Sequence, residues 1–224
     1  MPPSPAIRIA RPVIERHGPG LVTTDISEAG TGFDLDPFLI VSLYEMTGPT
    51  FPPHPHAGFS VATYILPESP IGFVNQDTLG NRNRIAPGAL HVTVAGRGVQ
   101  HEEQPERKGS IARGYQIWID HAEAAREVAP HALHLRATDV PVIAANGAEI
   151  RVVLGESNGA SSPLSLATPL RLVDVSLSAN RNFNQSLDDG ETAFLFVLAG
   201  ALSLGGTRVE AGELAIMESQ DDAI

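Results

Sequence analysis

Two short polar motifs contain the residues best suited to chemistry, His54-Pro55-His56 and His101-Glu102-Glu103. In each motif one residue separates the two outer side chains, and on an extended strand side chains at that spacing point to the same face. Two such strands side by side can bring three imidazoles and one carboxylate to a single point. This donor set suits iron, copper, nickel or zinc, because imidazole favours these metals and one carboxylate offsets part of their charge.

Four protein ligands on a metal that prefers six leave two positions for water, dioxygen or a bidentate substrate. A catechol-like or enediol substrate can chelate there. Glu103 has a second candidate role, as a general base that takes a proton from a substrate hydroxyl. The alternatives for Glu103 are a ligand only, or a solvated neighbour of Glu102, and the sequence leaves all three open.

The histidines differ in how well they fit this site. For the first motif the alternative is a solvated loop, but Pro55 between the two rings stiffens an extended backbone. His91 precedes the apolar Val92 in a strand, where it either faces the metal or hydrogen bonds elsewhere. Glu102 should point away from the site, because it alternates with two ligands. The remaining histidines are interpreted as surface or packing residues: His17, His121, His131 and His134.

Composition favours a globular protein of many short strands. The 224 residues are 42% hydrophobic, and 21 Gly and 18 Pro fit tight turns better than a helical bundle. A net charge of −11 without a basic cluster argues against direct binding to nucleic acid or anionic lipid. The absence of cysteine excludes disulfides and thiolate metal sites. With no secretory signal or membrane span in view, we expect a cytoplasmic protein.

Strands are predicted along the whole chain, from runs rich in Val, Ile, Leu, Phe or Thr bounded by turn residues. Only residues 120–128 are predicted to be helical. The predicted strands are 6–12, 38–46, 59–66, 90–94, 112–119, 150–154, 170–177, 193–198 and 213–217.

An internal repeat indicates two similar barrels. Residues 58–66 align with 190–198 at an offset of 132, and residues 85–90 resemble 209–214. At the first offset, His54 and His56 fall opposite Ser186 and Asp188, so the second half is not expected to copy the metal site. That half is short for a complete barrel, and we expect strand exchange between the halves or a second chain to complete it.

Five motifs resemble those of the pirin family of the cupin superfamily, most densely over residues 34–120 and more loosely to about 217. They are FPPHPHAGF (51–59), DTLG (77–80), PGAL (87–90), AGRGVQHEE (95–103) and YQIWID (115–120).

The resemblance implies an all-β bicupin of two packed, jelly-roll-like β-barrels. We expect an N-terminal metal-binding barrel at 1–122, an interdomain segment at 123–136 and a C-terminal barrel without metal at 137–224. The resemblance also implies an iron site of three histidines and one glutamate, which map onto His54, His56, His101 and Glu103. Known activities in the family include oxygen-dependent cleavage of flavonols such as quercetin, and co-regulation through binding to transcription factors.

The chain departs from the family pattern around the ligands. Ala57 replaces a common Arg, and Ser60 replaces a common Glu. Asn75 begins a run that is commonly His-Glu-Asp, and His91-Val92 stands in place of a Gln-Trp pair. Because the neighbours of metal ligands orient them and tune the metal, these changes bear on substrate and redox behaviour.

Three functions fit these observations. The first is a quercetinase-like dioxygenase that uses one divalent metal, Fe(II) in preference to Ni, Mn, Cu or Zn, on a chelating aromatic substrate. The second is an iron-dependent, redox-sensing regulator that binds a protein partner. The third is a metal-binding scaffold without turnover. The sequence leaves the oligomeric state open.

Overall fold

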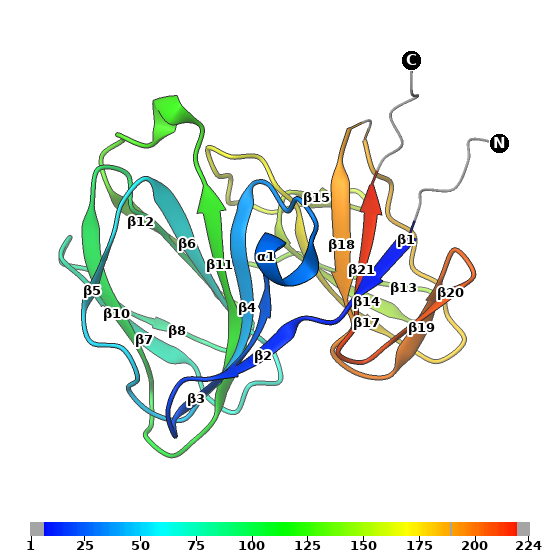
Figure 1. Ribbon diagram of the computed structural model, residues 1–224, viewed down its shortest axis with the longest axis horizontal. Coiled ribbons are helices and arrows are strands. Elements are labelled where there is room, and N and C mark those ends of the chain that lie inside the picture. Colours follow the sequence, from blue (N-terminus) through cyan, green and yellow to red (C-terminus); the bar gives the residue numbers. More distant parts are fainter. Residues whose placement is uncertain (1–6, 189, 219–224) are drawn as a thin grey trace.

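The structure is a computed structural model in which residues 7–188 and 190–218 are described (Figure 1). Among these residues, helical structure is confined to α1 (Glu28–Thr31) and a single 3-10 turn, η1 (Glu123–Ala125). The rest of the regular structure is antiparallel β-sheet, which confirms the prediction of an all-β protein. All nine predicted strands overlap strands of the structure, and Ala6, which begins the first of them, lies outside the described residues.

The first barrel consists of a seven-stranded sheet, in the order β12-β9-β6-β11-β4-β3-β2, and a four-stranded sheet, in the order β5-β10-β7-β8 (Figure 1). Its core joins the two sheets, with Leu21, Ile65 and Ala112 from the larger sheet and Phe73 and Ile85 from the smaller one. The strands are β2 (Val13–Arg16), β3 (Leu21–Ile26), β4 (Phe38–Met46), β5 (His54–His56), β6 (Phe59–Ile65), β7 (Phe73–Asp77), β8 (Arg82–Ile85), β9 (Leu90–Val94), β10 (Val99–Pro105), β11 (Ala112–Asp120) and β12 (His131–Leu135).

The second barrel is built from two three-stranded sheets, β13-β14-β17 and β1-β21-β18, and two short ribbons, β15-β16 and β19-β20. Small apolar clusters fill it, one around Ile150 and Val152 and another around Val209 and Ala215. The strands are β1 (Ile7–Ala10), β13 (Val142–Ala145), β14 (Ala148–Leu154), β15 (Glu156–Ser157), β16 (Ala160–Ser161), β17 (Leu172–Leu177), β18 (Thr192–Phe196), β19 (Ala201–Leu204), β20 (Thr207–Glu210) and β21 (Leu214–Glu218).

Strand exchange links the two barrels. β1 precedes the first barrel in the chain, yet it pairs with β21, with Ile7 opposite Met217 and Ala10 opposite Leu214. Figure 1 shows the dark-blue β1 beside the red β21. Of the two ways of completing the second barrel that the sequence left open, the structure shows the exchange. The domain limits at 122 and 137 stay a prediction. β1 belongs to the predicted N-terminal domain but pairs with β21 of the C-terminal one, and β12 belongs to the predicted interdomain segment but pairs with β9 of the N-terminal domain.

The internal repeat reappears as a repeated pattern of backbone hydrogen bonds. In the first barrel the Gly88 N–H donates to the Ile65 carbonyl and the Ile65 N–H donates to the Ala89 carbonyl, at 2.8 and 3.1 Å. In the second barrel the Gly212 N–H donates to the Val197 carbonyl at 2.8 Å, and the Val197 N–H donates to the Glu213 carbonyl at 3.1 Å. The two halves therefore share the turn that leads into β9 and β21.

The largest apolar cluster lies between the barrels. It joins Ala62 and Val92 of the first barrel to Val153, Leu214 and Ile216 of the second, and all five side chains are buried. Because side chains alternate across a strand, β6 and β9 turn one face to this cluster and the other to the interior of the first barrel. The second barrel thus covers the back of the sheet that faces the predicted site.

The prediction of a helix over residues 120–128 is wrong. β11 runs to Asp120, and only the turn η1 follows. The backbone of this segment bonds elsewhere, because the Val128 carbonyl accepts from the Arg97 N–H at 3.1 Å. Gly96 permits the close approach, since a Cβ at this position would overlap the Val128 carbonyl. Docking against the 95–98 turn therefore outweighs the local helical propensity.

Candidate metal centre

The pairing of β5 with β10 brings the three predicted imidazoles together. His101 lies directly opposite His54, and Val99 lies opposite His56. Directly opposed residues of antiparallel strands share a face, so the predicted alternation holds on both strands. The ring centroids of the three histidines lie 4.8–5.0 Å apart, and one ligand nitrogen from each lies within 4.8 Å of the other two.

The ring nitrogens are arranged as a cation would require. The Nε2 atoms of His56 and His101 lie only 3.0 Å apart. His54 Nδ1 lies 2.9 Å from the Pro52 carbonyl, which can only accept, so His54 carries its proton on Nδ1. The Nε2 lone pair of His54 is then free to bind a metal, and the carbonyl fixes the ring orientation.

Burial keeps the two inner rings neutral. Burial, and then the nearby His54, lowers the pKa of His56 to about 4. Burial lowers the pKa of His101 to about 3, with further contributions from His56 and His54. A protonated imidazole has no lone pair to give, so neutral rings at neutral pH are the form that binds a metal.

Glu103 lies two residues beyond His101 on β10 and therefore on the same face, but outside the group of three imidazoles. Its Oε2 accepts from Thr63 Oγ1 at 2.7 Å and from Gln116 Nε2 at 3.4 Å. Its Oε1 is buried and has no hydrogen-bond partner within the described residues. Burial raises the pKa of Glu103 to about 7, and the bonds from Thr63 and Gln116 act in the opposite direction.

These observations fit a divalent metal. A buried carboxylate oxygen without a partner is costly unless something binds it, and a cation supplies the missing interaction. Three imidazoles and one carboxylate are ligands that first-row transition metals accept. The structure therefore gathers three of the four predicted ligands, and Glu103 presents an unsatisfied oxygen on the same strand face.

Aromatic rings line one side of the centre. His56 contacts Phe59 and Trp118 with ring centroids 5.3 and 5.6 Å apart, and those two rings contact each other at 5.2 Å. Phe51 contacts His54 at 6.1 Å and is 48% exposed. His56 is thus buried against two partly buried rings, whereas the ring beside His54 is exposed.

Other acidic and imidazole groups make contacts outside this centre. Glu102 points away from the site, as predicted, and accepts from Gln76 and Gln104. His121 is buried, and its Nε2 lies 2.8 Å from Ser60 Oγ, while its Nδ1 has no hydrogen-bond partner within the described residues. His131 is exposed, and its Nδ1 lies 3.0 Å from the Ala129 carbonyl.

A second group of ligand-type side chains lies on the hairpin of β2 and β3. Glu15, His17 and Asp25 offer atoms within 4.8 Å of one another. Thr23 Oγ1 already links two of them, because it lies 3.0 Å from His17 Nε2 and donates to Asp25 Oδ2 at 3.0 Å. Glu15 is exposed. Thr23 therefore accounts for His17 Nε2 and Asp25 Oδ2, while Asp25 Oδ1 is buried and has no hydrogen-bond partner within the described residues.

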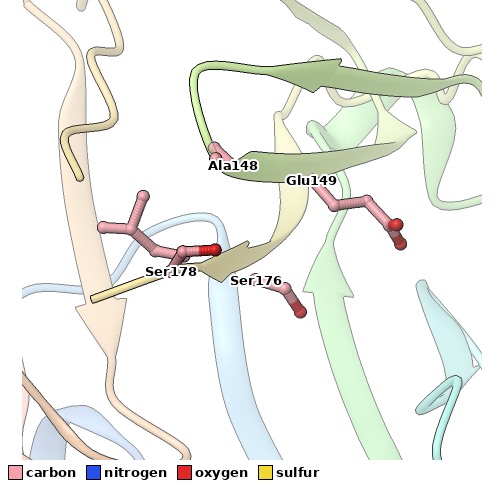
Figure 2. Close-up of a pocket in the computed structure, with 6 residues that line it drawn as sticks. Ala148, Glu149, Ser176 and Ser178 are labelled. Atoms are coloured by element: carbon pink, nitrogen blue, oxygen red, sulfur yellow. The ribbon is translucent and has the colours of Figure 1, made fainter. Parts of the chain in front are cut away.

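An open hollow of about 360 Å³ lies on the second barrel. Figure 2 shows Ala148 and Glu149 of β14 beside Ser176 of β17 and Ser178 just beyond it. The lining includes a single carboxylate and no imidazole, so it does not form a metal site. It is lined by Gly147, Ala148, Glu149, Ser176, Leu177 and Ser178.

Comparison with known proteins agrees with the geometry. The family model named Pirin matches residues 26–119, which include all four predicted ligands. Pirin-like protein 2 of Arabidopsis thaliana is 32% identical over 198 residues, or 85% of this chain. The chain belongs to the pirin family. It spans 60% of the length of that Arabidopsis relative.

Two solved structures share the pirin fold of this chain. Quercetin 2,3-dioxygenase from Acinetobacter baumannii is 22% identical, with a TM-score of 0.81 over 95% of this chain and 72% of that one. The bacterial pirin YhhW from Escherichia coli, in complex with nickel(II), is 18% identical, with a TM-score of 0.65 over 96% of this chain and 91% of that one. At these identities the likeness establishes the fold.

Sequence reasoning missed the residues that hold the predicted ligands in place. Thr63 and Gln116 bind Glu103 from β6 and β11, and Thr93 Oγ1 lies 3.5 Å from His101 Nδ1. The available signal was a polar residue at an inward position of an otherwise apolar strand.

No helix of the described residues is long and apolar enough to cross a membrane.

Proposed function

We propose that this protein is an oxidoreductase that binds one Fe(II) ion through His54, His56 and His101, with Glu103 as the fourth ligand. We further propose that it uses dioxygen on a flavonol-like, chelating substrate. The observation that carries the proposal is the convergence of three imidazole nitrogens within 4.8 Å beside the buried, unpartnered Oε1 of Glu103. When bound, a divalent iron ion supplies a Lewis acid for a chelating hydroxyl and a redox centre for dioxygen.

The side chains around the centre have separate tasks in this proposal. Thr63 and Gln116 hold Oε2 of Glu103, so that Oε1 is left to bind the ion or to take a proton from a substrate hydroxyl. Trp118 and Phe59 keep water from the His56 side, where an exposed metal would admit side reactions. Phe51, exposed beside His54, offers an apolar surface to an incoming aromatic ring.

The choice of reaction rests on the fold and on chemical balance. A protein of this fold from Acinetobacter baumannii is a quercetin 2,3-dioxygenase. A dioxygenase places both atoms of dioxygen in its products and therefore needs no external reductant. A flavonol offers adjacent hydroxyl and carbonyl oxygens that match the two coordination positions left open.

The test is metal content combined with oxygen uptake. We expect protein purified with iron to contain about one equivalent and to consume oxygen when quercetin is added. The His101→Ala variant should contain no iron, while His131→Ala, an exposed histidine outside the site, should match wild type. Equal iron in both variants, measured by elemental analysis, would refute the ligand assignment. Iron binding without oxygen uptake across flavonols and catechols would refute the activity alone.

The alternative is a regulator whose affinity for a protein partner depends on the iron oxidation state. Two observations favour it: the family's common Arg and Glu near the ligands are Ala57 and Ser60 here, and the net charge of −11 suits a basic partner. Partners captured with Fe(II)-loaded protein and released on oxidation would support this function over turnover.

A further inference from the structure

Three buried polar atoms on the inward faces of β4, β7 and β10 have no hydrogen-bond partner within the described residues. They are the hydroxyl oxygen of Tyr44, Oδ1 of Asn75 and Oε1 of Glu103. Tyr44 is 4% exposed, and Asn75 is fully buried. Buried polar groups are rarely left unpaired, because each one costs free energy. Three of them in the interior of one barrel indicate a partner that they share.

Asn75 and Glu103 are direct neighbours on the small sheet. They lie opposite each other on the antiparallel strands β7 and β10, so their side chains share a face. Asn75 Nδ2 donates to Asn83 Oδ1 at 3.1 Å, and Asn83 belongs to β8, on the other side of β7 from β10. Because the oxygen and the nitrogen of an amide point to opposite sides of the side chain, this bond turns Asn75 Oδ1 toward β10 and Glu103.

The hydroxyl of Tyr44 enters the same part of the barrel from the large sheet. Its ring stacks on that of Phe73, with centroids 5.1 Å apart, and Phe73 is two residues before Asn75 on the same face of β7. A Cβ on Gly114 would lie 2.6 Å from the hydroxyl oxygen, and Gly114 is two residues before the glutamine that binds Glu103. Burial, and then the nearby Glu103, raises the pKa of Tyr44. The hydroxyl therefore has neighbours of both acceptor residues beside it.

The chemistry of the three atoms identifies the ligand. An amide oxygen and a carboxylate oxygen only accept hydrogen bonds, so Asn75 and Glu103 cannot satisfy each other, and the Tyr44 hydroxyl has a single proton to give. A water molecule has two protons and two lone pairs, so it can donate to both oxygens and accept from the hydroxyl. About three hydrogen bonds are usual for a buried water. We propose that Tyr44, Asn75 and Glu103 Oε1 together hold one water molecule beside the candidate metal centre.

The water gives Tyr44 and Asn75 a role in the proposed function. A metal bound to Oε1 satisfies neither the tyrosine hydroxyl nor the amide oxygen, so it does not account for the site by itself. A carboxylate oxygen has two lone pairs, and Oε1 can therefore accept from the water and bind a metal together. Tyr44 and Asn75 are then positioning residues that fix Oε1 through the water, as Thr63 and Gln116 fix Oε2. This role rests on the proposed function, whereas the water is a property of the metal-free protein.

Urea unfolding of the chelator-treated protein tests the water without any metal. Tyr44→Phe keeps the ring that stacks on Phe73 and removes only the hydroxyl. If the hydroxyl bonds to the water, its removal lowers the urea midpoint, but if the hydroxyl has no partner, its removal relieves an unsatisfied group and raises the midpoint. We expect the midpoint to fall in Tyr44→Phe and not in the control Tyr115→Phe. An unchanged or higher midpoint in Tyr44→Phe would overturn the proposal.

A double-mutant cycle tests whether Tyr44 and Asn75 share one ligand. We expect the fall caused by Tyr44→Phe to be smaller in an Asn75→Leu background than in wild type, because Asn75→Leu already removes one of the partners of the water. Equal falls in the two backgrounds would show that the hydroxyl and the amide act independently, and the shared site would be wrong.

A crystal structure of the metal-free wild type gives the direct check. We expect density for one water within hydrogen-bonding distance of the Tyr44 hydroxyl, Asn75 Oδ1 and Glu103 Oε1. A direct bond from the Tyr44 hydroxyl to Glu103, with no water between them, would overturn the proposed ligand.

Nickel(II) affinity and the visible absorption bands of the bound nickel test the positioning role. We expect Tyr44→Phe to bind nickel about 10- to 100-fold more weakly than wild type, the usual loss when a partner of a metal ligand is removed, and to shift the bands. Tyr115→Phe should change neither. A purely structural effect of Tyr44→Phe would leave the bands of the loaded protein in place, and that result would overturn the positioning role.

The outcomes separate this inference from the proposed function. If Glu103→Gln binds nickel as tightly as wild type, Glu103 is not a ligand, and both the proposed ligand set and the positioning role are wrong. If Glu103→Gln loses nickel but Tyr44→Phe keeps the affinity and the bands of wild type, the positioning role fails and the metal centre stands.

Discussion

The hydroxyl of Tyr64 connects the first barrel to the second barrel, and removing it tests how much that connection stabilises the fold. Tyr64 is 1% exposed, and its hydroxyl donates to Asp174 Oδ2 on β17 at 2.8 Å. A hydrogen bond to a carboxylate contributes about 1.5–3 kcal/mol, and phenylalanine keeps the ring packing. We therefore expect Tyr64→Phe to lower the free energy of unfolding by about 1.5–3 kcal/mol.

For a protein of this size each kcal/mol shifts Tm by about 2–4 °C, so the expected loss is about 3–12 °C. Urea and thermal unfolding of chelator-treated protein measure it, with Trp118, the single tryptophan, as the probe. Tyr115→Phe is the matched control, since Tyr115 lies opposite Tyr64 on β11 and no hydrogen bond of its hydroxyl is seen within the described residues. Equal losses in the two variants, or a loss below about 0.5 kcal/mol in Tyr64→Phe, would refute the reasoning.

Three further outcomes follow from the same structure. Metal at about 100 times its Kd should raise the free energy of unfolding by about 2.7 kcal/mol and Tm by about 5–11 °C. In a thermal scan, both a chelator and the His101→Ala substitution should abolish this increase in Tm. Burial raises the pKa of Asp174 above its ordinary value of 3.8, so its favourable contribution to stability is full below its unfolded pKa and is lost as pH rises through the folded pKa. Asp174→Asn should flatten this loss in urea titrations carried out at rising pH from 3.8, and parallel curves for the variant and wild type would contradict the prediction. Gly96→Ala should cost about 1–3 kcal/mol more than Gly18→Ala, because both have positive φ but only Gly96 would press a Cβ into the Val128 carbonyl; similar unfolding midpoints would rule this out.

The parts of the site that follow from strand alternation were predictable, and the parts that follow from packing were not. The spacing within His54-Pro55-His56 and His101-Glu102-Glu103 is a local property, so the shared face of each pair could be read from the sequence. The sequence marks Thr63 and Gln116 as polar residues on their strands, but it does not indicate that they reach Glu103, because that depends on which strands stand opposite β10.

The fold shows the same division. Strands with dense β-branched and apolar residues, such as β4 and β9, were predicted with their observed limits. The exchange of β1 was left open, because pairing residues about 200 positions apart is decided by the whole molecule. The helix expected over residues 120–128 failed for a related reason, since the segment packs on the distant 95–98 turn, where the Val128 carbonyl accepts from the Arg97 N–H.

The second barrel carries no predicted ligand, yet hydrogen bonds from β6 connect it to the candidate metal centre. Thr63 faces the first-barrel interior and donates to Glu103 at 2.7 Å, while its neighbour Tyr64 faces the opposite way and donates to Asp174 at 2.8 Å. The adjacent strand β9 is arranged similarly, with Thr93 toward His101 and Val92 in the cluster shared with the second barrel. Because the same two strands orient the predicted ligands and anchor the interface, the rigidity of the candidate site depends on the second barrel as well.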